Sequence, residues 1–206
     1  MSECSQPMND ASSATQATTV YLIRHGQPTF WGSAVTSLRY DVPPGPPLAA
    51  EGRAQASMAA SFLSGSPPAV VYASPLDRAL QTAQIITAQL DLPMAIDERL
   101  AEHRRDETND QVAARLAAFW YERVTRAPGC IALVSHGSPI RIMLAMLGDV
   151  LTTDLERYHF DHGNIVPPAG IWRARCATTD GRLSPWELDL IFRTFVADPA
   201  TAKTGR

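Results

Sequence analysis

Residues 18–28 read Thr-Thr-Val-Tyr-Leu-Ile-Arg-His-Gly-Gln-Pro, and the fold is organised around them. Val20 to Ile23 form a continuous apolar run, which is typical of a strand that is buried on both faces of a parallel sheet. Arg24, His25 and a glycine follow directly. Because ligands bind at the carboxyl ends of strands in open α/β sheets, a cation and an imidazole at this point predict a site that handles anions.

The same order of strand, histidine and glycine returns later in the chain. Residues 131–134 form a second apolar run, and Ser135, His136 and Gly137 come directly after it. Ser138 and Pro139 then signal the start of a helix. A glycine after each histidine allows the backbone to approach a ligand closely, and the first turn of a helix offers free N–H groups to an anion.

A third apolar run, residues 69–73, leads into another predicted helix. We expect Ser74 to cap this helix, with Pro75 at its first position. Arg78 then lies in the first turn, where a cation opposes the helix dipole. An arginine in an unfavourable place near the carboxyl end of a strand is a candidate functional residue.

Two guanidinium groups and two imidazoles are therefore expected at one edge of the sheet, from Arg24, His25, Arg78 and His136. The oxygens of a phosphate dianion accept bidentate hydrogen bonds from arginine, so this set matches a phosphate group. The nucleotide-binding motifs GxGxxG and GxxxxGK[ST] do not occur in the sequence, which gives no support to nucleotide binding of those kinds.

Strands that alternate with helices predict the α/β class, as a three-layer α/β/α sandwich with a mostly parallel central sheet. We expect one domain over residues 18–196, a disordered polar tail over 1–17 and a loose tail over 197–206. The remaining predicted elements are a helix over 48–63 with Ala50, Ala54, Ser57, Met58 and Phe62 on its inner face, a short strand over 94–96, a helix opened by a capping box of Thr108 and Gln111, a short helix over 152–159, and strands over 171–176 and 186–195.

The composition excludes several classes of function. The 206 residues carry a net charge of −3, which gives no general attraction to nucleic acid or membranes. No apolar run approaches the ~18 residues that a transmembrane helix needs. The three cysteines show neither a disulfide framework nor zinc-ligand spacing, which fits a cytoplasmic protein. His159 and His162 have no further ligands nearby in the sequence, so no metal site is predicted.

Several segments resemble the histidine phosphatase superfamily, in its phosphoglycerate mutase-like branch. In the family's order they are LIRHG at 22–26, LAAEGRAQA at 48–56, SPLDRALQTA at 74–83 and SHG at 135–137, and LAE at 100–102 is similar to the segment that bears the family's acid. An RHG tripeptide alone is a weak signal, whereas segments in this order across residues 20–141 are specific.

The resemblance implies the roles of the site residues. His25 is the expected nucleophile and forms a phosphohistidine that water later hydrolyses, while Arg24, Arg78 and His136 hold the phosphoryl oxygens. Nearby guanidinium groups disfavour a protonated His25 and neutralise the transferring group, so neither a metal nor another cofactor is required. Glu102 is expected to protonate the leaving alkoxide and afterwards to activate water.

The chain also departs from the family pattern. Residues 30–32, Phe-Trp-Gly, stand where the family commonly places an asparagine, so one phosphate contact is missing or replaced, and the aromatic pair hints at an aromatic substrate. The few dozen residues that usually follow the acid and cover the site are reduced to residues 103–107. This shortened lid predicts an open pocket that favours water as the acceptor. Without the usual glycine after Glu102, Asp106 or Glu107 stays an alternative for the acid.

The predicted function is a metal-independent phosphomonoesterase that acts on a small organic phosphate, with no nucleic-acid or membrane partner. A phosphoglycerate mutase is the close alternative, which the short lid disfavours. A non-catalytic module that binds phosphorylated ligands is a third interpretation, which the presence of every catalytic residue type disfavours. The sequence leaves the oligomeric state open, and a homodimer is compatible with it.

Overall fold

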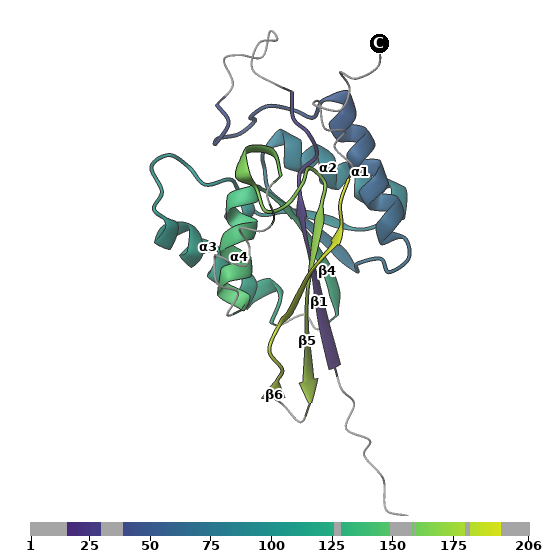
Figure 1. Ribbon diagram of the computed structural model, residues 1–206, viewed down its shortest axis with the longest axis vertical. Coiled ribbons are helices and arrows are strands. Elements are labelled where there is room, and N and C mark those ends of the chain that lie inside the picture. The colour runs from purple at the N-terminus through teal and green to yellow at the C-terminus, as the bar shows by residue number, and fades with distance from the viewer. Residues whose placement is uncertain are drawn as a thin grey trace, which may run out of the picture.

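A computed structural model describes residues 16–29, 39–125, 129–148, 158, 160–179 and 182–194, and Figure 1 shows their arrangement. The described elements, in chain order, are β1 (Gln16–Arg24), α1 (Ala50–Leu63), β2 (Val70–Ala73), α2 (Asp77–Leu90), β3 (Met94–Ile96), η1 (Glu98–Leu100), α3 (Asn109–Arg123), β4 (Cys130–Ser135), α4 (Gly137–Leu147), η2 (Asp161–Gly163), β5 (Ile171–Thr179), β6 (Arg182–Leu183) and β7 (Glu187–Phe192).

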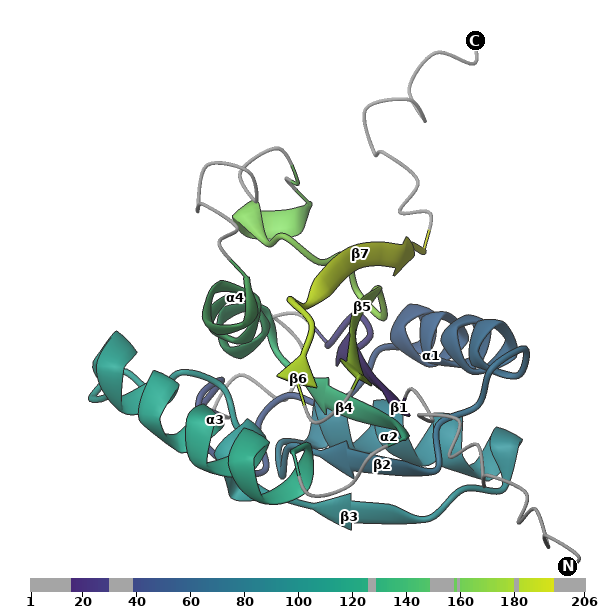
Figure 2. The same cartoon turned by 90° about the horizontal axis from the view of Figure 1, so that it is seen from below.

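The described strands form one mixed sheet in the order β3-β2-β4-β1-β5-β6, with β7 also paired to β5. The four strands β3, β2, β4 and β1 pair in parallel, whereas β5 runs antiparallel to β1 and to its other neighbours. Figure 2 shows this order from β3 across to β5 and β7. The prediction of a mostly parallel central sheet is confirmed.

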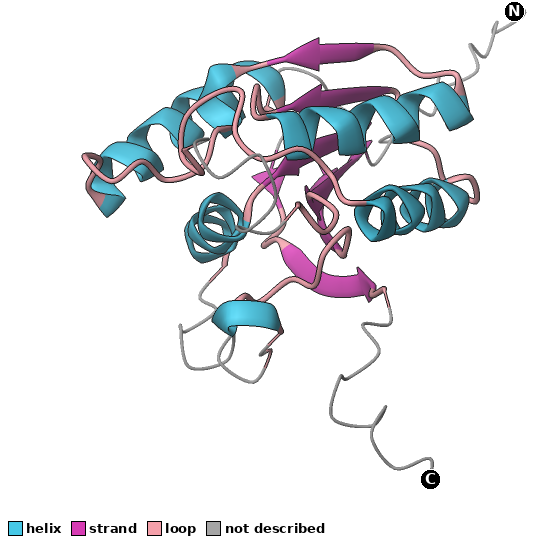
Figure 3. Ribbon diagram, turned by 90° about the horizontal axis from the view of Figure 1, so that it is seen from above, coloured by secondary structure: helices cyan, strands magenta, loops and turns pink. Residues whose placement is uncertain are grey.

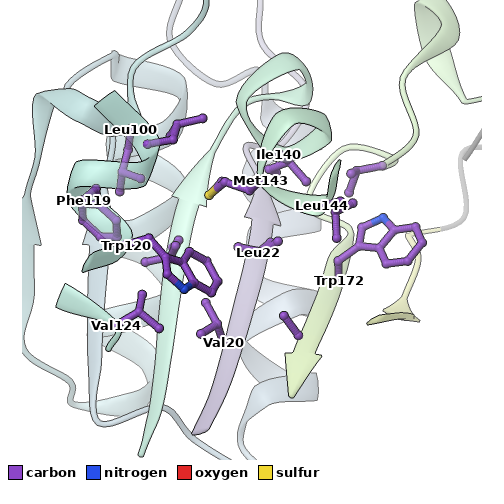
Figure 4. Packing of buried hydrophobic residues seen from close by; sticks show 14 of the residues in the cluster. Val20, Leu22, Leu100, Phe119, Trp120, Val124, Ile140, Met143, Leu144 and Trp172 are labelled. Carbon is purple, nitrogen blue, oxygen red and sulfur yellow. The ribbon is translucent and has the colours of Figure 1, made fainter. Parts of the chain in front are cut away.

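Helices cover both faces of the sheet, which completes the predicted three layers (Figure 3). Val20 and Leu22 of β1 pack with α3 and α4, while Tyr21 and Ile23 pack with α1 and α2. Figure 4 shows the first of these clusters, where Leu22 lies near Met143 and Trp120. Successive side chains of a strand point to opposite faces, so a strand with a core on each side needs an unbroken apolar run.

The first strand is longer than predicted. β1 begins at Gln16, so the polar tail assigned to residues 1–17 is wrong at its last two positions. The cause is tertiary, because β5 pairs with β1 in register from Gln16 opposite Thr178 to Ile23 opposite Ile171. Backbone pairing with a long neighbouring strand extends β1 beyond its apolar run.

The buried face of α1 also differs from the prediction. Met58 and Phe62 are 47% and 42% exposed, and the buried residues are instead Gly52, Gln55, Ala56, Ala59, Ala60 and Leu63. The small side chains on that face let the helix lie close to its neighbours. Phe62 packs outside against Phe192, with their ring centroids 4.9 Å apart.

Other predicted elements are confirmed or lie outside the described residues. Both halves of the capping box at Thr108 are present at the start of α3, and β3 covers the predicted strand over 94–96. The predicted helix over 152–159, apart from Tyr158, and the loose tail over 197–206 lie outside the described residues. Among the helices that the structure describes, none has both the length and the apolar character to cross a membrane.

Candidate active site

His25 stands directly after β1, at the carboxyl end of the parallel strands, and is held on both sides. Its backbone N–H donates to the carbonyl of Ser135 at 3.0 Å, and its carbonyl accepts from the N–H of Ala169 at 3.1 Å. The ring Nδ1 lies 2.7 Å from the carbonyl oxygen of Gly26. Because a carbonyl only accepts, Nδ1 carries the proton and the lone pair lies on Nε2.

The lone pair of His25 faces a buried arginine. Nε of Arg78 lies 3.2 Å from Nε2 of His25. Burial, followed by the charges of Arg78 and Arg24, holds the pKa of His25 well below its usual range. The imidazole is therefore neutral at pH 7, and its Nε2 lone pair accepts from Nε of Arg78. The lone pair can act as a nucleophile once this contact is released.

Arg78 is fully buried in the first turn of α2. Its two terminal nitrogens, Nη1 and Nη2, have no hydrogen-bond partner among the described residues. Buried donors without partners are costly in a folded protein. Two such donors on one guanidinium mark a place prepared for an anion.

Ser74 does not cap α2 as predicted, because the helix begins at Asp77 and its N-cap residue, Leu76, makes no side-chain cap. Ser74 Oγ instead lies 2.8 Å from Nε2 of His136. His136 is fully buried, and its Nδ1 has no hydrogen-bond partner among the described residues. Burial, then Arg78 and His25, lowers the pKa of His136 well below its usual range.

Glu102 lies between the two unpartnered groups. Its Oε2 is 3.8 Å from Nη2 of Arg78 and 3.9 Å from Nδ1 of His136. Burial raises the pKa of Glu102, and this effect outweighs the hydrogen bond from the backbone N–H of His103 and the attraction of nearby cations. Arg115 fixes this segment by donating to the carbonyl of Glu102 at 3.2 Å.

The two alternative acids have less suitable surroundings. Burial alone would raise the pKa of Glu107, but hydrogen bonds from the Arg115 side chain and from the backbone N–H of Arg104 outweigh it, and the pKa is lowered. Asp106 is exposed on the turn that replaces the lid. A general acid must hold its proton before the reaction, so the geometry favours Glu102.

Arg24 is held in a way that the sequence did not suggest. Nη1 and Nη2 donate to the two carboxylate oxygens of Asp161 at 2.5 and 2.8 Å, and Nη1 also donates to the carbonyl of Val166 at 2.9 Å. Only Nε of this buried side chain has no hydrogen-bond partner among the described residues. The terminal nitrogens of Arg24 therefore tie the segment around η2 to the site.

The glycines after the histidines allow close packing within the protein. A Cβ on Gly26 would lie 2.4 Å from the carbonyl oxygen of Gly52 in α1, and one on Gly137 would lie 1.8 Å from Oδ1 of Asn164. Both glycines thus leave room for another part of the protein where a side chain would stand. The backbone N–H of Gly26 also donates to Thr82 Oγ1 at 3.0 Å, which fixes the peptide beside the nucleophile.

A pocket of about 560 Å³ opens over Glu102. It is lined by Tyr40, Asp41, Glu102, His103, Arg104, Arg105, Glu107, Ser138 and Asn164. The predicted aromatic contacts Phe30 and Trp31 lie outside the described residues, so the openness of the pocket stays a prediction. His159 lies outside them too, and no group of three His, Cys, Asp or Glu residues in the described ranges could hold a metal ion.

The structure brings together all five predicted site residues, Arg24, His25, Arg78, Glu102 and His136. Sequence reasoning missed Tyr40, Ser74, Thr82 and Asp161 as supporting residues. Ser74 and Thr82 stand inside the family-like segment 74–83, so the motif itself could have indicated them. Tyr40 and Asp161 lie in loop-like sequence without a local signal.

Comparison with known proteins gives a consistent result. The model of the histidine phosphatase superfamily (branch 1) matches residues 20–107 and 103–167, while no curated protein sequence matches. A mycobacterial glucosyl-3-phosphoglycerate phosphatase is 22% identical, with a TM-score of 0.63 over 87% of this chain and 100% of that one. YhfR of Bacillus stearothermophilus is 20% identical, with a TM-score of 0.63 over 86% and 98%. A phosphoglycerate mutase of Bacillus anthracis is 16% identical, with a TM-score of 0.60 over 83% and 92%. These likenesses confirm the predicted fold.

Proposed function

Because the chain belongs to the histidine phosphatase superfamily, we propose that it is a phosphomonoesterase that hydrolyses a small organic phosphate through a phosphohistidine on His25, without a metal. One observation carries the proposal. Nη2 of Arg78 and Nδ1 of His136, both buried and without hydrogen-bond partners among the described residues, lie 3.8 and 3.9 Å from the same oxygen of Glu102. A phosphoryl group held by these donors lies within reach of both His25 and a carboxylic acid.

In the first step, Nε2 of His25 attacks phosphorus and the bond from phosphorus to the ester oxygen breaks. The proton on Nδ1 stays bonded to the carbonyl of Gly26 and stabilises the positive charge that develops on the ring. Arg78 gives up its contact with Nε2 and neutralises charge on the phosphoryl oxygens, while His136 donates a hydrogen bond to them from Nδ1. For His136 to donate through Nδ1, its Nε2 accepts the hydroxyl proton of Ser74.

Glu102 supplies the proton to the leaving oxygen in this step. The resulting carboxylate then takes a proton from water, the water oxygen attacks phosphorus, and the bond from phosphorus to Nε2 breaks. Inorganic phosphate leaves, while His25 and protonated Glu102 are restored. The raised pKa of Glu102 supports this exchange, because it brings the acid nearer to the working pH.

The short connection between η1 and α3 favours hydrolysis over mutase chemistry. Only residues 101–108 join these elements, and Arg104 and Arg105, which line the pocket, are exposed to solvent. Water can therefore reach a phosphohistidine. Isomerisation of phosphoglycerate without release of phosphate would favour the mutase instead.

The test is steady-state hydrolysis of p-nitrophenyl phosphate in excess EDTA, from acid to neutral pH, with His25→Ala beside the parent. We expect turnover that survives chelation and disappears in the variant, with the thermal unfolding of both proteins measured as the control for folding. A binding module would bind inorganic phosphate without turnover in either protein. Full activity in folded His25→Ala would contradict the proposed nucleophile.

A further inference from the structure

Tyr40 covers the face of the buried phosphate-site arginine. The Cζ atom of Arg78 lies 3.8 Å from the centroid of the Tyr40 ring. A guanidinium at this distance over an aromatic ring is attracted by the negative charge of the ring face, and more strongly so where water is excluded. Arg78 is fully buried, so this contact is made in a desolvated place.

The loop that carries Tyr40 is attached on two sides. Its Pro44 carbonyl accepts a 2.7 Å hydrogen bond from the backbone N–H of Asp77, the first residue of α2. Its Asp41, which is paired with Arg39, accepts from the backbone N–H of Arg105 at 3.2 Å. The loop is thus fixed both to the helix of Arg78 and to the turn that follows Glu102.

The same loop also closes the space beside the guanidinium. Gly45 has a φ of +67°, and a Cβ there would lie 3.1 Å from Nη1 of Arg78. A larger residue would therefore be strained and would push against the terminal nitrogen. With the ring on one face, the loop backbone near Nη1 and His25 at Nε, the guanidinium has few other orientations.

We propose that Tyr40 is a positioning residue that holds the guanidinium of Arg78 in place to receive the phosphoryl group. The inference rests on the proposed function, because it assigns Arg78 to phosphate. Tyr40 acts through its ring face, because the guanidinium carbon of Arg78 lies 3.8 Å from the ring centroid. It also lines the pocket beside Glu102, so its loss admits water to the arginine.

The test compares Tyr40→Phe with Tyr40→Leu, and uses Tyr121→Leu as a matched control at a tyrosine of α3 that is 61% exposed. The measurements are the inhibition constants of inorganic phosphate and orthovanadate, together with kcat and KM for p-nitrophenyl phosphate. Loss of a desolvated cation–π contact predicts that Tyr40→Leu weakens both inhibitors roughly 10- to 30-fold. Tyr40→Phe keeps the ring and should match the parent.

Unchanged inhibition constants in Tyr40→Leu would overturn the inference, and so would an equal loss in Tyr40→Phe. If Tyr40→Leu does not fold, Tyr40→Trp serves instead. Its larger ring should keep or improve the binding of phosphate, and weaker phosphate binding by the folded Tyr40→Trp variant would count against the role of the ring. Failure of the proposed function is distinguishable, because the parent itself would then not hydrolyse the ester, whether or not it binds phosphate.

Discussion

Replacement of Glu102 by glutamine tests the acid directly. The amide keeps the size of the side chain but cannot exchange a proton. Loss of a general acid typically slows a reaction 10²- to 10⁴-fold, which is about 2.7 to 5.4 kcal/mol of barrier at about 1.36 kcal/mol per decade. We expect the upper part of this range for an alkyl phosphate, because the other two carboxyl groups that line the pocket, Asp41 and Glu107, both have lowered pKa values and do not hold a proton to replace that of Glu102.

Glu107→Gln is the matched control, since it makes the same change five positions further along the chain. The assay measures kcat and kcat/KM on an alkyl phosphate and on p-nitrophenyl phosphate, whose leaving group needs little protonation. Glu102→Gln should release an early burst of p-nitrophenolate and then stall, because the second step still needs a base. In the parent, kcat/KM should fall as pH rises through the raised pKa of Glu102, and this limb should vanish in the variant. Full turnover of the alkyl ester by Glu102→Gln, with a loss in Glu107→Gln, would refute the assignment.

Three further predictions concern the supporting groups and the charge of the site. Asp161→Asn weakens the bidentate pair with Arg24 and should lower the free energy of unfolding in urea by about 1.5–3 kcal/mol. The control Asp189→Asn weakens an exposed pair with Arg173 and should lower it by at most about 1 kcal/mol. Equal effects of the two changes would contradict the structural role of Asp161. Ser74→Ala removes the hydroxyl that bonds to Nε2 of His136 and should lower the free energy of unfolding by about 1–3 kcal/mol. It should also lower kcat more than Ser74→Thr does. A kcat equal to that of the parent would count against the proposed tautomer of His136, with its proton on Nδ1. The pKa of buried His25 is lowered in the native state, so at pH values below about 6.5, the ordinary pKa of histidine, the unfolded state binds more protons than the native state. A histidine that stays neutral in the native state should therefore lower the free energy of unfolding by about 1.2 kcal/mol between pH 7 and pH 5.5. Urea unfolding of His25→Gln should show a correspondingly flatter dependence on pH, and an unchanged slope would exclude the buried neutral form.

The sequence was most informative where function follows a strand directly. One polar residue separates each of the two histidines, His25 and His136, from the buried apolar run before it. Because parallel strands end at a common edge of the sheet, the meeting of the two histidines could be predicted without a structure. Arg78 was indicated by its unfavourable place in a first turn. These signals are local and depend only on strand burial and on the direction of the chain.

Local sequence patterns gave wrong predictions where a side chain or a helix face contacts a residue far away in the sequence. Ser74 has the residue type of a helix cap, yet its hydroxyl bonds to His136, 62 positions away. α1 contains alanines around most of its circumference, so its sequence permits more than one inward face, and the close approach of Gly52 to Gly26 selected one of them. Neither choice can be made from periodicity.

The sequence by itself therefore determined the layered α/β fold and four of the groups that meet at its edge, Arg24, His25, Arg78 and His136, because apolar runs and turn residues specify strands, helices and their ends. Glu102 came only from the resemblance to the family. Only the tertiary structure decided how those groups are held and charged. Asp161 reaches Arg24 across 137 positions of the chain, and Tyr40 lies over Arg78 from a separate loop. Burial, which shifts the pKa values of His25 and Glu102 in opposite senses, exists only when the whole chain is packed, since desolvation disfavours whichever form of a group carries charge.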